Sequence, residues 1–473
     1  MRDQSFRTSP SERGIALLIT SVMLVFIIPM IGLSVDVGIL YAVRTKLSMA
    51  CDAGALVGAR SLSRGLDDAA QQASAKAVAK QYILLNFPNG YFGTPAPVPP
   101  DPTIDESIAN QRSVTVSASV NVPLYFLRWL GGSFTAVSST ATATRRDVNV
   151  VIVMDRSGSL ALSGSCASLQ QAAVNFVNRF ANGRDNVALV TFATSSLADF
   201  PIANNFQSAS PNVITILNSL NCTGATNSAE GLWLGYSQLV ALNQPNALNV
   251  LLFFTDGYPT AITSTFPIKV SSTCTDHSAK LGVLTVGFSP GAPLIPVIPI
   301  GLYYQVGQTQ PMGLDQTLAP TSASARQNCS YAANVQTIAA DVTYIPNTDS
   351  YGNAMNTNYQ PVTYYDGNGN INVDAWSVQN ASVNAADSAG LRIRQGASVA
   401  GIGGGISGIR VYSIGLGNFG GVPDDFLERV SNDPRATNFD NSKPAGFYIY
   451  APTAADLSDA FGQIAAEILH ISR

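Results

Sequence analysis

A long apolar segment near the N-terminus predicts a membrane anchor. Residues 14–35 carry no charged side chain, and about 20 apolar residues in a helix are enough to cross a bilayer. The alternative is a cleaved signal peptide, but that has a shorter apolar core and a small-residue cleavage site directly after it, which this segment lacks. Three basic residues before the segment, against two after it, favour a cytoplasmic N-terminus.

We expect the same helix to continue beyond the membrane, because residues 37–62 are rich in Ala and Leu and contain no Pro. One helix from Gly14 to Leu62 would be about 75 Å long, which is typical of a pilin subunit, and an ordinary stalk is the alternative. Asp36 lies at the far edge of the apolar segment. We expect its carboxylate to meet headgroup water, with pairing to a partner's charge as the alternative.

The next segment has the pattern of a small α+β unit. Residues 66–87 predict a helix, and the prolines within 94–102 require an extended chain. Every second residue of 113–122 is Val or Ala, and a second alternation spans about 134–144. Both alternations predict strands of one small sheet, and the segment offers no candidate chemistry.

From residue 148 onward, apolar strands alternate with amphipathic helices. The predicted strands cover 148–154, 187–192, 249–254, 409–414 and 447–450, and the predicted helices cover 167–181, 227–243, 424–431 and 453–468. Thr453 and Asp456 form a capping motif at the start of the last helix. This alternation is typical of a doubly wound α/β domain, in which ligands bind beyond the carboxyl ends of the parallel strands.

These patterns predict three regions along the chain. Residues 1–63 form the transmembrane and extended helix, residues 64–146 form the small α+β segment, and residues 147–473 form the α/β domain. The stretch at about 258–385 is longer than any α/β connection, so we expect an insertion with its own strands, including the apolar stretch 281–305.

Composition narrows the range of functions. The chain has 26 Lys and Arg against 30 Asp and Glu, for a net charge of -4, which argues against a nucleic-acid-binding protein. It has only 2 His, which argues against a His-rich zinc site and against His-based acid–base catalysis.

The cysteines predict disulfides in an oxidising compartment. The chain has 5 Cys, none in C-x-x-C spacing, and four of them lie in the last two-thirds of the chain. Among the three possible connectivities of these four we predict Cys166–Cys222 and Cys274–Cys329. Buried free thiols are the alternative.

Polar oxygen-bearing residues follow two of the predicted strands. Asp155, Ser157 and Ser159 come directly after strand 148–154, and Asp256 follows strand 249–254. The loop before helix 227–243 adds Thr223 and Thr226. Carboxylates and hydroxyls without His or Cys suit a hard cation, with Mg²⁺ first and Mn²⁺ or Ca²⁺ next, and not Zn²⁺ or Cu²⁺. The alternative is that the hydroxyl groups only cap turns and helices.

The order D-x-S-x-S, then a Thr before a G-L helix, then T-D-G resembles the von Willebrand factor type A (vWA) family. The resemblance implies a metal-ion-dependent adhesion site in which one divalent cation is held by Asp155, Ser157, Ser159, Thr226 and Asp256. Thr226 is preferred to Thr223 because T-N-S-A-E-G-L has the family's spacing from Thr to Gly-Leu. An open coordination position on the cation would attract an acidic side chain of a partner protein.

The N-terminal third resembles a second family. E-R-G-I-A-L-L, the apolar span with D-V-G, K-L-S-M-A-C-D-A-G-A-L-V-G-A-R and F-L-R-W-L-G-G are similar to the TadE/TadG-like proteins of tight-adherence (Flp) pilus assembly. Processed relatives carry Glu five residues after the cleavage Gly. That position is Ile19 here, which argues against prepilin-type cleavage after Gly14.

Together the two resemblances imply a non-enzymatic pilus-assembly or adhesion protein of the bacterial inner membrane. We expect a single membrane pass through residues 14–35, the bulk of the chain in the periplasm, association with a pilus or the cell surface, and pilus or envelope assembly proteins as partners. Two rivals remain. One is a metal-dependent hydrolase, for which Glu230 is the nearest candidate base. The other is an envelope scaffold without a metal.

Overall fold

The computed structural model describes residues 10–108, 110–245, 247–267, 280–288, 296–303, 342–365, 367–417 and 424–471. It divides into two compact units, Met1–Arg145 and Arg146–Arg473, which are described separately below. The fold is mixed α/β, as the hydrophobic pattern predicts.

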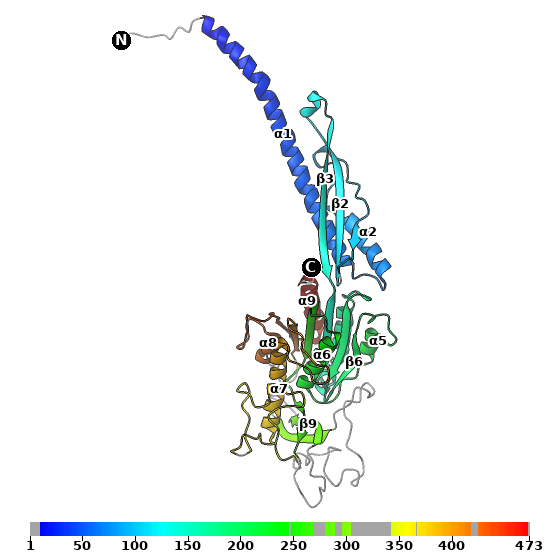
Figure 1. Ribbon diagram of the computed structural model, residues 1–473, viewed down its shortest axis with the longest axis vertical. Coiled ribbons are helices and arrows are strands. Elements are labelled where there is room, and N and C mark those ends of the chain that lie inside the picture. Colours follow the sequence, from blue (N-terminus) through cyan, green and yellow to red (C-terminus); the bar gives the residue numbers. More distant parts are fainter. Residues whose placement is uncertain are drawn as a thin grey trace, which may run out of the picture. The chain divides into compact units, whose positions relative to one another are not determined.

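The first unit consists of two helices and a three-stranded sheet (Figure 1). Its elements are α1 (Pro10–Ser61), α2 (Asp68–Asn86), β1 (Thr103–Asp105), β2 (Gln111–Pro123) and β3 (Phe134–Arg146), with short helical turns η1 (Tyr91–Gly93) and η2 (Leu127–Leu130). Alternate residues of β2 enter a core with α1 and α2 that includes Val43, Leu47, Ala79, Ile83 and Val114. The predicted long helix, second helix and two main strands are therefore confirmed.

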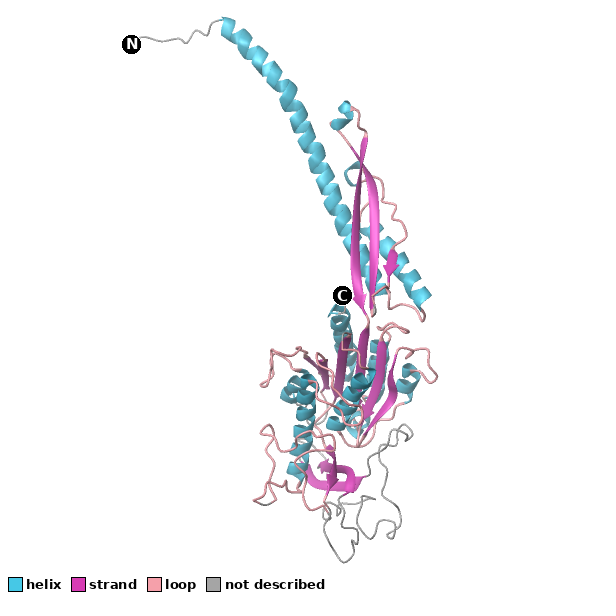
Figure 2. Ribbon diagram, in the orientation of Figure 1, coloured by secondary structure: helices cyan, strands magenta, loops and turns pink. Residues whose placement is uncertain are grey.

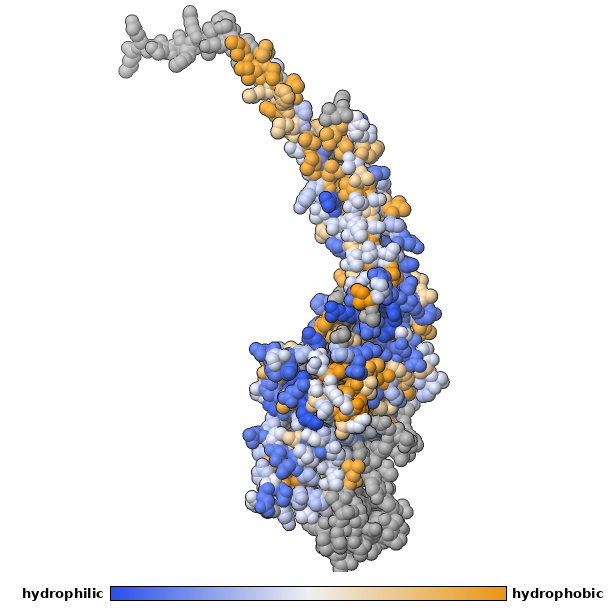
Figure 3. Space-filling model, viewed as in Figure 1, coloured by the Kyte–Doolittle hydropathy of each residue, from blue (hydrophilic) through white to orange (hydrophobic). Residues whose placement is uncertain are grey.

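The N-terminal part of α1 is apolar and exposed. Helix α1 is long and apolar enough to cross a membrane, and Figure 3 shows its outer half as a continuous hydrophobic surface. Large apolar side chains such as Leu17, Val25 and Phe26 are about two-thirds exposed in this part (71%, 69% and 66%). Exposed apolar surface of this extent is expected where lipid replaces water.

Asp36 corrects one expectation from the sequence. Its carboxylate does not face the aqueous edge of the membrane, because the residue is only 1% exposed. Instead it accepts hydrogen bonds from the backbone N–H groups of Tyr125, Phe126 and Leu127, at 3.0, 3.0 and 2.7 Å. The backbone of residues 125–127, at the entry to η2, therefore satisfies this charge.

The second unit is built on one six-stranded sheet in the order β12-β11-β7-β4-β5-β6. The strands are β4 (Val148–Asp155), β5 (Asn186–Phe192), β6 (Ser196–Ala203), β7 (Leu248–Thr255), β11 (Arg410–Leu416) and β12 (Tyr448–Ala451). All neighbours are parallel except β6, which runs antiparallel to β5 at the edge. Counted along the chain, this is the doubly wound order 3-2-1-4-5-6, read from the β6 edge.

Helices cover both faces of this sheet (Figure 2). They are α3 (Gly158–Leu162), α4 (Cys166–Val177), α5 (Val213–Ser219), α6 (Ser228–Leu242), α7 (Ala375–Gln395), α8 (Asp424–Ser431) and α9 (Leu457–Ile471), with the turn η4 (Ala454–Asp456) before α9. Val151 and Val153 of β4 pack in the core with α6, α7 and α8. Val150 and Ile152 pack in the opposite core with α4, α5 and α9. The capping box of Thr453 and Asp456 is present, as predicted.

A second sheet lies within the predicted insertion. It has the order β10-β9-β8, with β8 (Ala261–Phe266), β9 (Lys280–Phe288) and β10 (Pro296–Tyr303) paired antiparallel. Helix α7 crosses position 385, at which we expected the insertion to end, and packs against α6 in the core of the unit. Strand β6 and helix α5 were not predicted.

Gly235 allows α6 to lie unusually close to the central strand of the sheet. A Cβ atom at this position would lie 2.4 Å from Cγ2 of Val153. We therefore expect Gly235→Ala to lower the free energy of unfolding by about 1–3 kcal/mol, measured by denaturant unfolding. Gly462 on α9 is the matched control because a Cβ there meets nothing within 4 Å. Gly462→Ala should be neutral or stabilise by up to ~1 kcal/mol, and an equal loss in both variants would contradict the close approach.

Candidate metal centre

The carboxyl ends of β4 and β7 bring two acidic residues to one edge of the sheet. The strands are parallel neighbours with Met154 opposite Phe254, so Asp155 and Thr255 end them at the same level, and Asp256 follows. The chain leaves β4 toward β5 on one side, while β7 continues the sheet on the other. Loops diverge at such a reversal of strand order and open a crevice above the sheet.

Four of the predicted ligand residues form one hydrogen-bonded cluster. The hydroxyl of Ser159 donates to Oδ1 of Asp256 at 2.8 Å, and the hydroxyls of Ser157 and Ser159 are 3.0 Å apart. Ser157 Oγ lies 3.5 Å from the same Asp256 oxygen. Asp155 Oδ1 accepts the backbone N–H of Ser157 at 2.7 Å. Residues almost 100 positions apart in the chain thus place their oxygen atoms together.

Asp155 is held by its surroundings and is fully buried. Its second oxygen, Oδ2, accepts the hydroxyl of Thr255 at 2.6 Å. Burial and, second to it, the neighbouring charge of Asp256 raise the pKa of Asp155 to about 7, after the lowering effect of the Ser157 and Thr255 hydrogen bonds is included. A cation between the two carboxylates would remove this cost because it favours their ionised forms.

Thr226 lies in the loop of residues 220–227, which leads into α6. Two hydrogen bonds connect this loop to the segment after β4: Thr223 N–H donates to the carbonyl of Arg156 at 2.7 Å, and Gly158 N–H donates to the carbonyl of Gly224 at 3.0 Å. Thr226 itself is buried, and its N–H donates to the hydroxyl of Thr260 at 2.9 Å. The loop is therefore held beside the Asp155 cluster.

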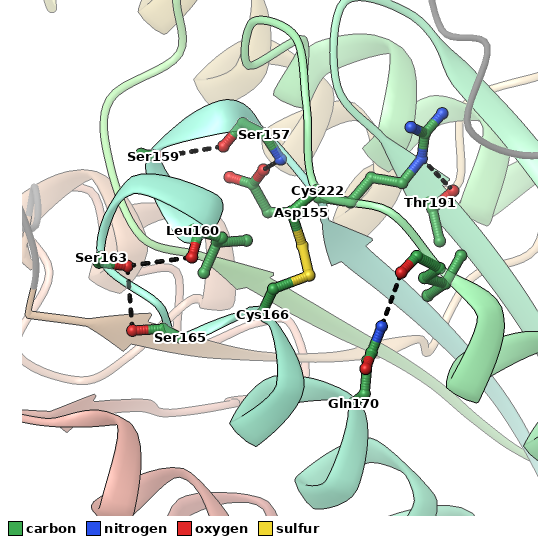
Figure 4. Close-up of a disulfide and its surroundings, with 12 residues drawn as sticks. Asp155, Ser157, Ser159, Leu160, Ser163, Ser165, Cys166, Gln170, Thr191 and Cys222 are labelled. Carbon is green, nitrogen blue, oxygen red and sulfur yellow. Dashed lines mark hydrogen bonds between the residues drawn. A yellow bond between two sulfur atoms is a disulfide. The ribbon is translucent and has the colours of Figure 1, made fainter.

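A disulfide fixes the same two segments. Cys166, the first residue of α4, is bonded to Cys222 in the loop before α6, which confirms one predicted pair. Figure 4 shows this bond close beneath Asp155 and the Ser157–Ser159 pair. Cys274 and Cys329 of the second predicted pair lie outside the described residues.

Thr255 and Thr260 were missed from the sequence. Thr255 is the first residue of the T-D-G motif, and its hydroxyl bonds both Asp155 and Gly257 of the loop that follows β7. The T-D-G motif could have indicated this contact. Thr255 directly precedes Asp256, and it ends β7 at the level at which Asp155 ends β4. Nothing in the sequence spacing indicates that Thr260 bonds to Thr226.

Glu230 is not positioned as a general base. It is 2% exposed, and its Oε2 accepts hydrogen bonds from the amide of Asn227 at 2.9 Å and from the hydroxyl of Thr263. Asn227 also caps α6. Glu230 therefore serves to hold the loop and the start of α6.

The donor set fits a hard cation. The hydroxyls of Ser157 and Ser159 meet the Asp256 carboxylate, and the Asp155 carboxylate accepts the N–H of Ser157, so these side chains offer the oxygen donors that Mg²⁺ and Ca²⁺ prefer. Within the described part of the chain, no three His, Cys, Asp or Glu side chains are grouped closely enough to hold a metal. At this edge of the sheet, the serine and threonine hydroxyls are the candidate ligands beside the two carboxylates.

Comparison with known proteins identifies the two regions. The family model of the von Willebrand factor type A domain matches residues 149–293, and the model of the TadE/G-like Flp pilus-assembly family matches residues 14–61. The chain contains a TadE/G-like segment followed by a vWA domain. Both matches agree with the resemblances seen in the sequence motifs.

Individual relatives are distant. The uncharacterized protein YfbK of Escherichia coli (strain K12) is 31% identical to this chain over 109 residues. These are 23% of this chain and 18% of YfbK. The PilB minor pilin from Streptococcus sanguinis has 14% sequence identity and a TM-score of 0.34, over 79% of this chain and 78% of that one. The vWF domain of the type V pili tip protein Mfa5 from Porphyromonas gingivalis has 15% identity and a TM-score of 0.35, over 70% of this chain and 98% of that one.

The disulfide should stabilise the vWA domain and its candidate metal centre together. The bond closes a loop of 56 residues, for which the chain-entropy model gives about 4 kcal/mol. We expect the Cys166→Ala/Cys222→Ala variant to lose about 2–4 kcal/mol of unfolding free energy and to bind Mg²⁺ more weakly. Denaturant unfolding with and without Mg²⁺ measures both effects. Reductant should lower the stability of the wild type more than that of the variant. Equal stabilities of the two proteins without reductant would contradict the role of the bond.

Cation binding should depend on pH through Asp155. Because its pKa in the folded state is about 7, above the usual 3.8, the metal-free domain holds a proton there and becomes less stable as pH rises from 4 to 7. A cation competes with this proton, so the stabilisation by a fixed Mg²⁺ concentration should be small near pH ~5 and grow toward pH ~8. Thermal unfolding across this range tests it. The effect should vanish in Asp155→Asn, and a pH-independent shift in the wild type would contradict it.

Proposed function

We propose that the protein is a membrane-anchored pilus-assembly or adhesion protein whose vWA domain binds an acidic group of a partner through a divalent cation. The observation that supports this most directly is the hydrogen bond from Ser159 to Asp256, which joins the ends of β4 and β7 into one oxygen cluster. The TadE/G-like segment supports a place in pilus assembly.

In this proposal Asp155, Ser157, Ser159, Thr226 and Asp256 hold the cation, and Mg²⁺ is the first candidate. The negative charges of the two carboxylates would nearly balance the charge of a divalent ion. A bound cation would supply an open coordination position for a carboxylate from the partner. In this proposal the protein holds these residues at one edge of the sheet while one coordination position of the cation stays open to the partner.

The N-terminal segment supplies the location. The apolar part of α1 would cross the bacterial inner membrane once, with the remainder of the first unit and the whole second unit on the periplasmic side. The Cys166–Cys222 disulfide supports an oxidising compartment for the vWA domain. Pilus or envelope assembly proteins in the same compartment are the expected partners.

We propose a binding role rather than catalysis. A hydrolase with a cation at this site would need a general base within reach of the attacking water. The nearest acidic candidate from the sequence, Glu230, is engaged with Asn227 and Thr263 in the interior. A hydrolase would be favoured instead if ester or phosphate turnover by the pure protein disappeared in Asp155→Ala.

Asp256→Asn provides the sharpest test of the cation site because its two effects have opposite signs. Without a cation, the variant lacks the Asp256 charge that opposes ionisation of Asp155. At pH ~8 its melting temperature should therefore exceed that of the wild type, by about 2–4 °C for each kcal/mol of unfolding free energy gained. Mg²⁺ at about 100 times its Kd should raise the wild-type melting temperature by about 5 °C and leave the variant unchanged. Full-length protein in detergent, with chelator or with Mg²⁺, Mn²⁺ or Ca²⁺, provides the comparison.

Asp199 is the matched control. It is also a buried carboxylate, burial raises its pKa to about 6, and it accepts a hydrogen bond from Thr191 within the sheet. Asp199→Asn should therefore keep the full cation-dependent rise. If no ion stabilises the wild type, the metal-free scaffold becomes the better explanation. If the protein is such a scaffold, Asp155→Ala should leave pilus assembly and adhesion intact in cells. If it acts through the proposed cation site, Asp155→Ala should abolish them.

A further inference from the structure

The end of the β2–β3 hairpin, residues 124–134, presents aromatic side chains beside the apolar part of α1. Tyr125 and Phe126 are each 47% exposed, and Phe134 is 65% exposed. Figure 3 shows hydrophobic surface on this end adjoining that of α1 within the same unit. Large exposed aromatic residues next to one another are uncommon on a surface that faces only water.

Asp36 fixes the hairpin end to α1. The three N–H groups that its carboxylate accepts belong to Tyr125, Phe126 and Leu127, at the start of η2. Such N–H groups have no partner within the helical turn and would otherwise need water. The carboxylate therefore satisfies three backbone donors at once, and these donors in turn stabilise a buried charge.

Gly32 shows how closely the two elements meet. A Cβ atom on Gly32 would lie 2.7 Å from the ring of Phe126. Gly32 is one helical turn before Asp36, inside the apolar segment 14–35. At 1.5 Å per residue, the ring of Phe126 lies about 5 Å inside the end of that segment. This depth corresponds to the interfacial layer of a bilayer, where aromatic side chains are favoured.

We propose that the hairpin end is a second membrane-contact element, which places its aromatic side chains in the outer interfacial layer next to α1. This inference rests on the proposed membrane anchor. It explains why the backbone donors of η2 are satisfied by Asp36, since unpaired N–H groups at this depth would be costly. The exposed Arg128 in the same turn is a cation long enough to reach lipid phosphate.

Brominated lipids test the contact directly. The chain has 3 Trp, at positions 129, 233 and 376, and only Trp129 belongs to the hairpin end. In full-length protein reconstituted into phosphatidylcholine–phosphatidylglycerol vesicles, acyl chains brominated near the headgroup should quench part of the tryptophan emission. Trp129→Phe should abolish the quenched component. Equal quenching in wild type and variant would overturn the proposal, and so would the absence of quenching in both. Quenching would also be absent if a second copy or another protein covered the hairpin end.

Flotation separates this inference from the anchor on which it rests. Protein that does not float with the vesicles contradicts the anchor, whereas protein that floats without Trp129-dependent quenching contradicts only the hairpin contact. Asp36→Asn should float normally, show reduced quenching and exchange the amide hydrogens of residues 125–127 faster. Asp52, an exposed acid on the same helix, is the control: Asp52→Asn should match the wild type in all three measurements. Unchanged quenching and exchange in Asp36→Asn would show that its carboxylate does not hold the hairpin end.

Discussion

The meeting of two carboxylates at the ends of β4 and β7 is the constraint around which the vWA domain is arranged. Asp155 and Asp256 are both buried, and like charges at close range oppose the folded state unless something compensates them. The surroundings compensate in part, through the hydroxyls of Thr255 and Ser159 and the N–H of Ser157. A cation at the proposed site would offset the remainder of this cost.

The buried carboxylate of Asp36, in the first unit, is in the opposite situation. Asp36 receives three backbone N–H groups, so its charge is balanced within the first unit. Asp155 has hydrogen-bond donors too, but it also has an acidic neighbour. Asp36 thus links α1 directly to residues 125–127. Asp155 and Asp256 are suited to link the ends of β4 and β7 through a bound ion. In the first unit, a carboxylate forms a permanent link through backbone hydrogen bonds. In the second unit, the proposed link between carboxylates forms only when a cation binds.

Much of this architecture follows from the sequence because its strongest elements are local. The apolar runs at 148–154 and 249–254 and the oxygen residues after them predict both the sheet and its functional edge. Strand β6 escaped prediction because it lies at the edge, with a Pro and mixed exposure. The partners of Asp36 are 89 to 91 residues away, and the bond from Thr255 to Asp155 spans 100 residues. No short-range pattern encodes such contacts.

Three links hold the segment after β4 to the loop before α6: backbone hydrogen bonds, the Cys166–Cys222 disulfide and, in the proposed function, the cation. The first two are present without a ligand, so the ligand residues need little rearrangement when an ion binds. A preorganised site loses less conformational entropy on binding. A site of this kind suits the partner binding that we propose for the vWA domain.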